Sequence, residues 1–318
     1  MENGTYIDDF FGGKDTLEKA CKVADQVNRL CMAGGFTLKK WINNDPYVLK
    51  FIPKQNRISA STIQIDDSSI VHALGLAWHP STDQFNFTLR LDEPKTIYKR
   101  TILSTISKLF DPLGFISPIT ITGKILIQEL WSSGLGWDDS LPPVLIDKWS
   151  DFIKRLQDAS NFTFPRWIGF NSIDSFELHG FCDASQQAIS AVVYLRFCSS
   201  DASVTTTLVA SKTKVAPLKR LTIPRLELLG AVLLVKLVKS ILLTMGKPVP
   251  IFAGIDSQVA YTWITNHPSR WKEFVHNRVC YIQETLPQCK WRLVPGVENS
   301  ADLATRGITS SQLTESSI

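Results

Sequence analysis

The chain has 318 residues, of which 44% are hydrophobic and 20% are charged. This balance excludes an intrinsically disordered chain, and the length allows two or three domains that each have a core. The net charge of +4 is compatible with a nucleic-acid partner but does not require one, since many mildly basic proteins bind no nucleic acid.

The cysteines and the N-terminus indicate the compartment in which the chain works. Six cysteines are scattered without a C-x-x-C pair or a Cys/His set with zinc spacing, which favours a reducing environment. The first residues lack the apolar core of a secretion signal. The longest apolar run, 226–243, contains Glu227, Lys236 and Lys239, so we predict a buried helix there and no membrane span.

The N-terminal part predicts two hairpins around a helix. The stretch T-Y-I-D-D-F-F-G-G is typical of a strand-turn-strand hairpin with Asp8 and Asp9 at its tip. Asp15 as N-cap and Glu18 three residues later predict the start of a helix with a capping box. A second hairpin is expected with strands at 74–78 and 85–91.

The middle of the chain has the periodicity of helices. Apolar residues recur at helical spacing over 102–110 and 119–131, and again after Pro142-Pro143. The run D-P-L-G at 111–114 separates the first two helices, and Pro118 marks another turn. This region contains no recognisable catalytic constellation.

The C-terminal half returns to strands and then alternates them with helices. Strands are predicted at 175–181, 189–197, 205–211, 249–255 and 291–294. Helices are predicted from Pro224, over 256–264 and 273–284, and after the cap Asn299-Ser300. The order β-β-β-α-β-α-α-β-α indicates an α/β layer fold.

Four carboxylates in this half form the candidate site. Glu227 is a lone acid in the first turn of a strongly apolar helix, where an unpaired charge is costly. Three more acids lie at predicted strand ends or helix starts: Asp183, Asp256 and Asp302. Mg²⁺ prefers carboxylate oxygens, and two such ions can cleave a phosphodiester. We therefore predict one two-metal site that binds Mg²⁺ or Mn²⁺.

Each acid also has an ordinary structural explanation. Asp183 could be a turn residue, and Asp256 could be the N-cap of its helix. Asp302 could simply favour the dipole at the start of the last helix. The four together, in this order of strands and helices, are much more specific than any one of them.

Asp8 and Asp9 form a second candidate metal site. Tyr6 before them and Phe10-Phe11 after them complete the pattern Y-x-D-D in a hydrophobic setting. A solvated turn is the alternative interpretation. Polymerase chemistry, which also uses two metals held by carboxylates, would need one more acid.

A basic cluster precedes Glu227 and could contact phosphates, with a solvated loop as the alternative. Its members are Lys212, Lys214, Lys219, Arg220 and Arg225. Trp263, Trp271 and Trp291 could stack on bases, although core packing is the better interpretation. Motifs of a Walker A loop, a zincin or a hydrolase triad do not occur.

Seven segments, spread in order over almost the whole chain, form a recognisable series. They read Y-I-D-D-F-F-G-G, G-G-F-T-L-K-K-W, F-D-P-L-G-F-I-S-P, Q-E-L-W, F-C-D-A-S, S-K-T-K-V-A-P-L-K-R-L-T-I-P-R-L-E-L-L-G-A and N-S-A-D-L-A-T-R-G. Together they resemble the pol polyprotein of BEL/Pao-type LTR retrotransposons. The resemblance implies part of a reverse transcriptase palm over 1–95, a mainly helical thumb/connection region over 96–165 and a ribonuclease H-like mixed-sheet domain over 166–318.

The resemblance also implies roles for the acids and partners for the chain. Asp8 and Asp9 match the polymerase acids, while Asp183, Glu227, Asp256 and Asp302 match those of ribonuclease H. The implied partners are an RNA–DNA hybrid or template-primer and the other pol domains. The implied location is a cytoplasmic virus-like particle or the nucleus.

Two departures from the family pattern limit what is expected. The fingers and the first polymerase Asp are missing, so we expect no DNA synthesis by this chain alone. The loop His that precedes the last Asp in many ribonucleases H has no counterpart, because the segment reads V-P-G-V-E-N-S-A-D. Product release or proton transfer is therefore expected to be slower or to depend on another group.

The leading hypothesis is a metal-dependent ribonuclease that cuts RNA in RNA–DNA hybrids. One alternative is a catalytically inactive, nucleic-acid-binding remnant of a retroelement. Another is an aspartic peptidase, because this region is also called a Pao retrotransposon peptidase. The peptidase is the weaker alternative, since no Asp-Ser or Asp-Thr pair is followed by Gly.

Overall fold

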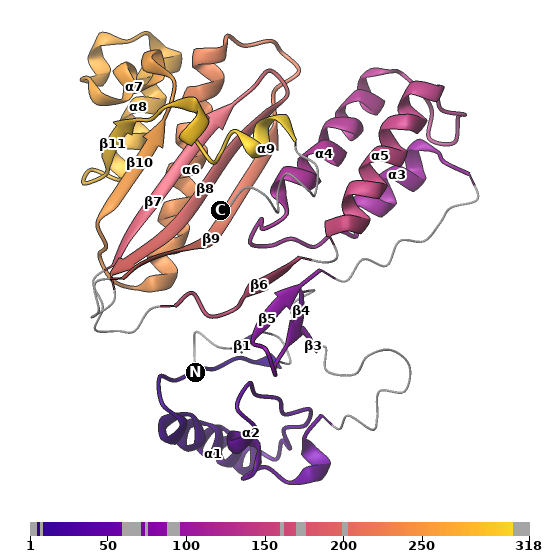
Figure 1. Cartoon of the computed structure of the whole chain (residues 1–318), viewed down its shortest axis with the longest axis vertical. Helices are drawn as coiled ribbons and strands as arrows, with labels where there is room; N and C mark the ends of the chain where they lie inside the picture. The colour runs from indigo at the N-terminus through magenta and orange to yellow at the C-terminus, as the bar shows by residue number, and fades with distance from the viewer. Residues whose placement is uncertain are drawn as a thin grey trace. The chain divides into compact units, whose positions relative to one another are not determined.

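The computed structural model describes residues 5–6, 9–58, 71–73, 76–87, 96–159, 162–169, 176–198 and 203–307. The chain forms two compact units. The first contains 1–86 and 163–167, and the second contains 87–162 and 168–318. The elements of both units are labelled in Figure 1.

The first unit combines short strands with helices. β1 (Thr5–Tyr6) and β2 (Asp9–Phe10) pair antiparallel, as the Y-x-D-D hairpin predicts. The helices are α1 (Leu17–Ala33) and α2 (Pro46–Leu49), followed by a 3₁₀ turn, η1 (Lys54–Asn56). Thr16 caps α1 by accepting from the Lys19 amide, so Asp15 as N-cap was wrong. The shorter Thr side chain takes this role one residue later.

A four-stranded antiparallel sheet completes the first unit. Its order is β3 (Val71–Ala73), β4 (Leu76–His79), β5 (Gln84–Asn86) and β6 (Thr163–Pro165). The predicted second hairpin corresponds to β4 and β5, with Asp83 at φ 54° in its turn. β6 comes from far along the chain, a pairing that the periodicity of neither segment predicts.

The second unit begins with the three predicted helices. They are α3 (Lys99–Ser107), α4 (Ser117–Ser132) and α5 (Pro143–Ala159). Asp111 accepts hydrogen bonds from the amides of Phe115 and Ile116 just before α4. Pro118 lies in the first turn of α4, where proline is tolerated because that turn lacks intrahelical partners for its amides. The predicted separate turn at Pro118 is therefore absorbed into the helix.

A five-stranded mixed sheet is the centre of the second unit. Its order is β11 (Lys290–Leu293), β10 (Ile251–Ile255), β7 (Phe176–Ala184), β8 (Ala188–Cys198) and β9 (Val204–Val215). The β7, β8 and β9 strands are antiparallel, whereas β10 runs parallel to β7 and β11. The predicted α/β fold with a mixed sheet is confirmed.

Helix α6 (Ile223–Met245) covers one face of this sheet (Figure 1). Its apolar residues pack with those of β7, β8 and β10 in the largest core cluster of the described residues. By length and composition alone α6 is apolar enough to cross a membrane, a criterion that the buried core helices of folded proteins also meet. The other helices are α7 (Gln258–Thr265), α8 (Glu273–Thr285) and α9 (Leu303–Arg306), with 3₁₀ turns η2 (Pro268–Arg270) and η3 (Gly296–Glu298).

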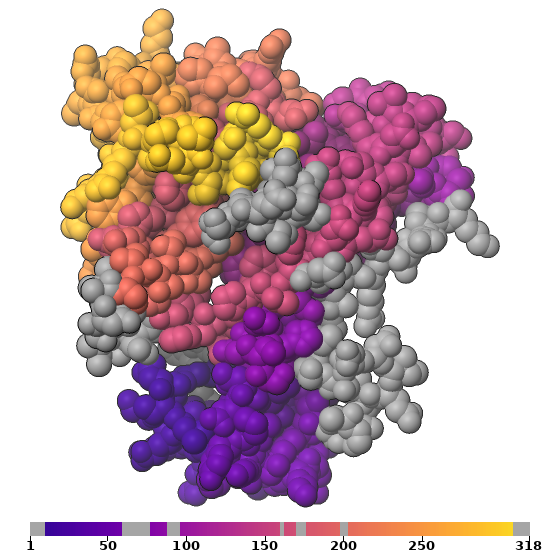
Figure 2. All heavy atoms as spheres, viewed as in Figure 1, coloured from indigo at the N-terminus to yellow at the C-terminus, as the bar shows by residue number. Residues whose placement is uncertain are grey.

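Helix α4 packs against β9 and against α9 within the same unit. In Figure 1, α9 lies between the sheet and α4, and in Figure 2 the C-terminal segment (yellow) lies on the face turned to the viewer. The predicted domain boundaries after residues 95 and 165 stay a prediction. In the structure, residues 87–162 belong to the same compact unit as the five-stranded sheet.

Candidate metal centre

Three of the four predicted acids converge at one end of the sheet. One carboxylate oxygen from each of Asp183, Glu227 and Asp256 lies within 4.8 Å of the others. They come from β7, α6 and the residue after β10. Since β7 and β10 run parallel, their carboxyl ends meet at the same edge, which explains how residues far apart in sequence come together.

Asp183 is buried near the end of β7, with 5% of its surface exposed. Its Oδ2 accepts a hydrogen bond from the hydroxyl of Thr305. Burial raises the pKa of Asp183, and the neighbouring Asp302 raises it further, while the Thr305 hydrogen bond acts in the opposite direction. The turn after β7 is held by Ser185 instead, whose hydroxyl accepts from two amides of that turn.

Glu227 is also 5% exposed, and its Oε2 is buried without a hydrogen-bond partner. Because α6 begins at Ile223, Glu227 lies in the second turn rather than the first as expected. Burial raises the pKa of Glu227 to about 9, and the charges of Asp183 and Asp256 add to the shift. The Ala184 amide donates a hydrogen bond to this carboxyl group, but no positive charge of the described residues pairs with it, so the group needs either a proton or a cation.

A close approach of α6 to β7 brings Glu227 to Asp183. A Cβ at Gly230, one turn after Glu227 on the same helix, would lie 3.1 Å from the Asp183 carbonyl oxygen. The absence of a side chain at Gly230 therefore lets the helix lie directly on the strand end. The apolar stripe of α6 then points into the core while Glu227 faces the other acids.

Asp256 is half-buried directly after β10, with Oδ1 lacking a hydrogen-bond partner. Its carboxylate accepts from its own amide and from the side chain of Asn299. Burial, and then the charge of Asp183, raise its pKa. The hydroxyl of Ser257 caps α7 by accepting from the Ala260 amide, so the alternative in which Asp256 is the helix cap is wrong.

Asp302 lies at the N-cap position of α9 but makes no side-chain cap hydrogen bond. Its carboxylate pairs with Arg306, with 2.9 Å between Oδ1 and Nε. The pKa of Asp183 responds to both the charge and a side-chain hydrogen bond of Asp302, so this fourth acid adjoins the other three. Arg306 also lowers the pKa of Asp256, which places its positive charge near the cluster.

The four carboxylates fit a divalent cation, because some of their oxygens are buried and have no hydrogen-bond partner. Glu227 Oε2 and Asp256 Oδ1 are buried and lack partners, and they belong to residues that share one small volume with Asp183. Carboxylate oxygens without nitrogen or sulfur donors are the set that Mg²⁺ and Mn²⁺ prefer. Burial and mutual repulsion raise the pKa values of Asp183, Glu227 and Asp256, and a cation here would offset the repulsion.

The second predicted metal site falls largely outside the described residues. Asp8 lies outside them, and Asp9 is described only as a residue of β2, opposite Tyr6. The Y-x-D-D site therefore stays a prediction.

The predicted basic cluster is spread over three places in the structure. Lys212 and Lys214 are exposed at alternate positions of β9, and Lys219 and Arg220 are exposed in the loop that leads to α6. Arg225 instead lies over the ring of Phe274 on α8, 5.0 Å from its centroid. Trp263, Trp271 and Trp291 pack against the core, in keeping with the favoured interpretation of these residues.

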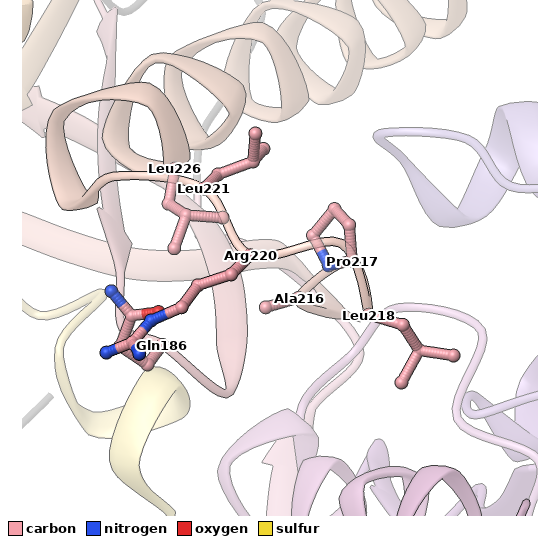
Figure 3. Close-up of a pocket in the computed structure, with 7 residues that line it drawn as sticks. All are labelled: Gln186, Ala216, Pro217, Leu218, Arg220, Leu221 and Leu226. Atoms are coloured by element: carbon pink, nitrogen blue, oxygen red, sulfur yellow. The ribbon is translucent and has the colours of Figure 1, made fainter. Parts of the chain in front are cut away.

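A pocket of about 260 Å³ is lined by residues that are close in sequence to two of the acids. Figure 3 shows Gln186, from the turn after β7, next to Arg220. The remaining lining residues are Ala216, Pro217, Leu218, Leu221 and Leu226. Gln186 is three residues from Asp183, and Leu226 immediately precedes Glu227. The Gln186 amide and the Arg220 guanidinium could bind a phosphate, and the apolar lining residues could contact a ring.

Two polar residues of this centre were not predicted from the sequence as part of it. Thr305 is fully buried and bonds to Asp183, and Asn299, predicted only as a helix cap, donates to the Cys182 carbonyl at 3.0 Å. Both belong to the segment N-S-A-D-L-A-T-R-G that also carries Asp302. The spacing of Thr305, three residues after Asp302, was the available signal, since it places both on one helical face.

Comparison with known proteins gives one family and several structural relatives. Residues 98–253 match the family described as Pao retrotransposon-like RNaseH-like domain. No curated protein sequence matches the chain.

Among solved structures, RNase H1 from the archaeon Halobacterium salinarum shares 17% identity over 39% of this chain and 90% of its own, with a TM-score of 0.27. The foamy viral protease-reverse transcriptase in complex with dsDNA shares 14% identity over 92% of this chain, with a TM-score of 0.49. The chain spans about half the length of that protein, 54%. The N-terminal RNase H domain of a Mycobacterium tuberculosis protein shares 16% identity over 44% of this chain and 99% of its own, with a TM-score of 0.27.

Proposed function

The chain carries a Pao retrotransposon-like RNaseH-like domain at residues 98–253, and from this premise we propose that it is a two-metal ribonuclease that cuts the RNA strand of RNA–DNA hybrids. In this proposal it is part of a retroelement pol polyprotein. Asp183 and Glu227 lie inside the matched segment, while Asp256 and Asp302 follow it in sequence and join them in space.

The observation that carries the proposal is the set of buried, partnerless carboxylate oxygens. Surface acids usually have structural uses such as caps and ion pairs. Here Ser185 stabilises the turn after β7 and Ser257 caps α7. Asp183 is therefore not the residue that holds the turn, and Asp256 is not the helix cap. Keeping three acids together at this cost is expected where a cation binds.

Asp183, Glu227, Asp256 and Asp302 would hold the metal ions, which when bound activate a water and stabilise the leaving oxygen. The other residues hold these acids in place. Thr305 fixes the Oδ2 side of Asp183, and Asn299 links Asp256 to the Cys182 carbonyl. Arg306 supplies an exposed positive charge beside Asp302. This charge could bind a phosphate oxygen of the substrate.

Nucleic acid as the substrate is supported by the surroundings of the acids. Lys212 and Lys214 give β9 an exposed basic edge, and Lys124 of α4 adds a third amine beside Thr213 at 3.5 Å. Gln186 and Arg220, which line the pocket, supply an amide and a guanidinium that could bind a sugar-phosphate unit. Recognition of the RNA strand would use its 2′-hydroxyl and backbone shape rather than base sequence.

The test is cleavage of an end-labelled RNA–DNA hybrid with Mg²⁺ or Mn²⁺, beside RNA–RNA and DNA–DNA duplexes. We expect the parent chain to cut only the hybrid. Asp183→Asn should cut it at least about 100-fold more slowly, because the variant lacks a carboxylate that would hold the metal ions at the reacting phosphate. Asp138→Asn is the matched control, since Asp138 is an exposed acid paired with Arg100 in the same unit. Hybrid binding without cleavage by the parent would favour the inactive remnant instead.

A further inference from the structure

Helix α4 lies outside the sheet, yet it contacts two segments that build the candidate site. We propose that α4 positions the site through two residues: Thr122, which sets the helix that bears Asp302, and Gln128, which sets the loop that lines the pocket. This inference rests on the proposed function, and it makes the helical region a working part of the nuclease.

The first contact joins α4 to α9. Gly307, which ends α9, has φ +72°, and a Cβ there would lie 2.5 Å from Thr122 Cγ2. The backbone after α9 thus lies directly against the Thr122 side chain. Asp302 and Thr305 are on this short helix, and Thr305 bonds to Asp183. A shift of α9 would therefore move one acid and release the hydrogen-bond partner of another.

The second contact joins α4 to the pocket. Gln128 donates from Nε2 to the Ala216 carbonyl at 2.7 Å, and the Ala216 amide donates to the Gln187 carbonyl at 2.8 Å. Ala216 lines the pocket together with Gln186 and Arg220. Ala216 thereby connects the loop before α6 to the turn after β7, and Gln128 holds Ala216 from α4.

Helix α4 is itself firmly anchored, as a positioning element must be. Much of it is buried, including Ile119, Ile121 and Leu130. The segment before it hydrogen-bonds to β9, where the Ser211 amide donates to the Leu113 carbonyl at 2.7 Å. The family match begins at residue 98, so it includes the three helices as well as β7, β8 and β9.

The alternative is that α4 merely covers the edge of the sheet. In that case any disturbance of α4 would lower stability and affect metal binding, kcat and KM together. The positioning proposal instead predicts that the two residues act on different quantities, because they contact different segments.

The experiment compares Thr122→Leu and Gln128→Met in the full chain. Thr122→Leu adds bulk against Gly307, and we expect kcat to fall about 10-fold or more and Mn²⁺ affinity, measured by calorimetry, to weaken, with KM for the hybrid within about twofold of the parent. Gln128→Met keeps the size but removes the donor, and we expect KM to rise several-fold with kcat and Mn²⁺ affinity unchanged. Thr122→Ile serves in place of the leucine variant if that protein does not fold.

Glu129→Gln is the matched control, since Glu129 is next to Gln128 but pairs with Lys148 of α5 at 2.6 Å. We expect parent values for this variant. The proposal is wrong if Thr122→Leu keeps the parent kcat and Mn²⁺ affinity, or if both variants change kcat and KM in equal proportion. If the parent itself does not cut the hybrid, the proposed function fails, and Mn²⁺ affinity together with hybrid affinity in Ca²⁺ then decides whether each α4 contact acts as stated.

Discussion

The hydroxyl of Thr305 donates a hydrogen bond to Asp183 Oδ2, across a separation of 122 residues in sequence. Both side chains are buried, and the same Thr305 oxygen lies 3.0 Å from the Asp302 carbonyl. One small side chain thus connects the strand that carries the first acid to the helix that carries the fourth. The Ser185 hydroxyl adds a second link by donating to the Thr305 carbonyl at 2.9 Å.

Replacing Thr305 tests the value of this connection. Thr305→Val keeps the shape of the side chain but leaves Asp183 Oδ2 without its buried donor, which should cost about 1–3 kcal/mol of unfolding free energy. We expect hybrid cleavage to fall about 10-fold or more, because Asp183 loses its orientation. Thr305→Ser keeps the hydroxyl and should retain most of the activity. Equal activity of the Val and Ser variants would show that the hydrogen bond has no role in orienting Asp183.

The raised pKa of Glu227 predicts a specific pH dependence of stability in the metal-free protein. The pKa of this carboxyl is about 9 in the folded chain, against an ordinary value of 4.5, so folding favours the protonated form. The stability that protonated Glu227 contributes is therefore complete below pH 4.5 and is lost as the pH rises toward 9.

Glu227→Gln removes this pH-dependent loss because glutamine never ionises. In EDTA, we expect the variant and the parent to have similar Tm values near pH 4.5, with the variant becoming more stable than the parent as the pH approaches 9. Thermal denaturation followed by circular dichroism measures both proteins. A Tm difference that stays the same from the acidic to the alkaline end of this range would contradict an unpaired, buried Glu227.

Metal addition should stabilise the parent but not a variant that lacks one of the ligand oxygens. A cation that binds only the folded chain stabilises it by mass action, by about 2.7 kcal/mol at a free concentration of about 100 times Kd. We expect Mn²⁺ to raise the Tm of the parent at neutral pH but to have little effect on Asp256→Asn, which lacks one ligand oxygen. Asp138→Asn, altered at a surface pair, should respond as the parent does. An equal rise in all three proteins would place the bound metal elsewhere.

The basic edge of β9 predicts a salt-dependent contribution to hybrid binding. Replacing Lys212 and Lys214 by alanine removes two exposed cations, so the slope of log Kd against log salt should decrease by about one for each phosphate that these lysines neutralise. We expect weaker binding of all hybrid sequences and a kcat near that of the parent at saturating hybrid. Lys239→Ala provides the control, since Lys239 is exposed further along α6. An unchanged salt slope in the double variant would support the solvated-surface alternative.

A good part of the sheet domain could be predicted from the sequence. Period-two strands and period-3.6 helices report burial on one face of each element, which is a local property of the chain. The order of elements around β7, α6 and β10 followed from it, and so did the expectation that Asp183, Glu227 and Asp256 would converge. Parallel strands have their carboxyl ends at the same end of the sheet. Acids at the ends of β7 and β10 are therefore close together.

Contacts between distant segments could not be predicted in this way. The pairing of β6 with β5, the packing of α4 on β9 and α9, and the position of Thr305 beside Asp183 each join residues with no shared periodicity. Their partners are selected by shape and by hydrogen bonds that exist only after the sheet has formed.

The sequence by itself thus determined which acids are candidates for a site: Glu227, because an acid among apolar residues carries a desolvation cost, and the three Asp residues, because they lie at strand ends or helix starts. Only the tertiary structure decided which of these acids do not stabilise a turn or cap a helix, and which neighbours hydrogen-bond to them. Ser185 holds the turn after β7, Ser257 caps α7, and Thr305 bonds to Asp183. Such assignments depend on competition among hydrogen-bonding groups for the same partners, and that competition is settled by distances in the folded chain.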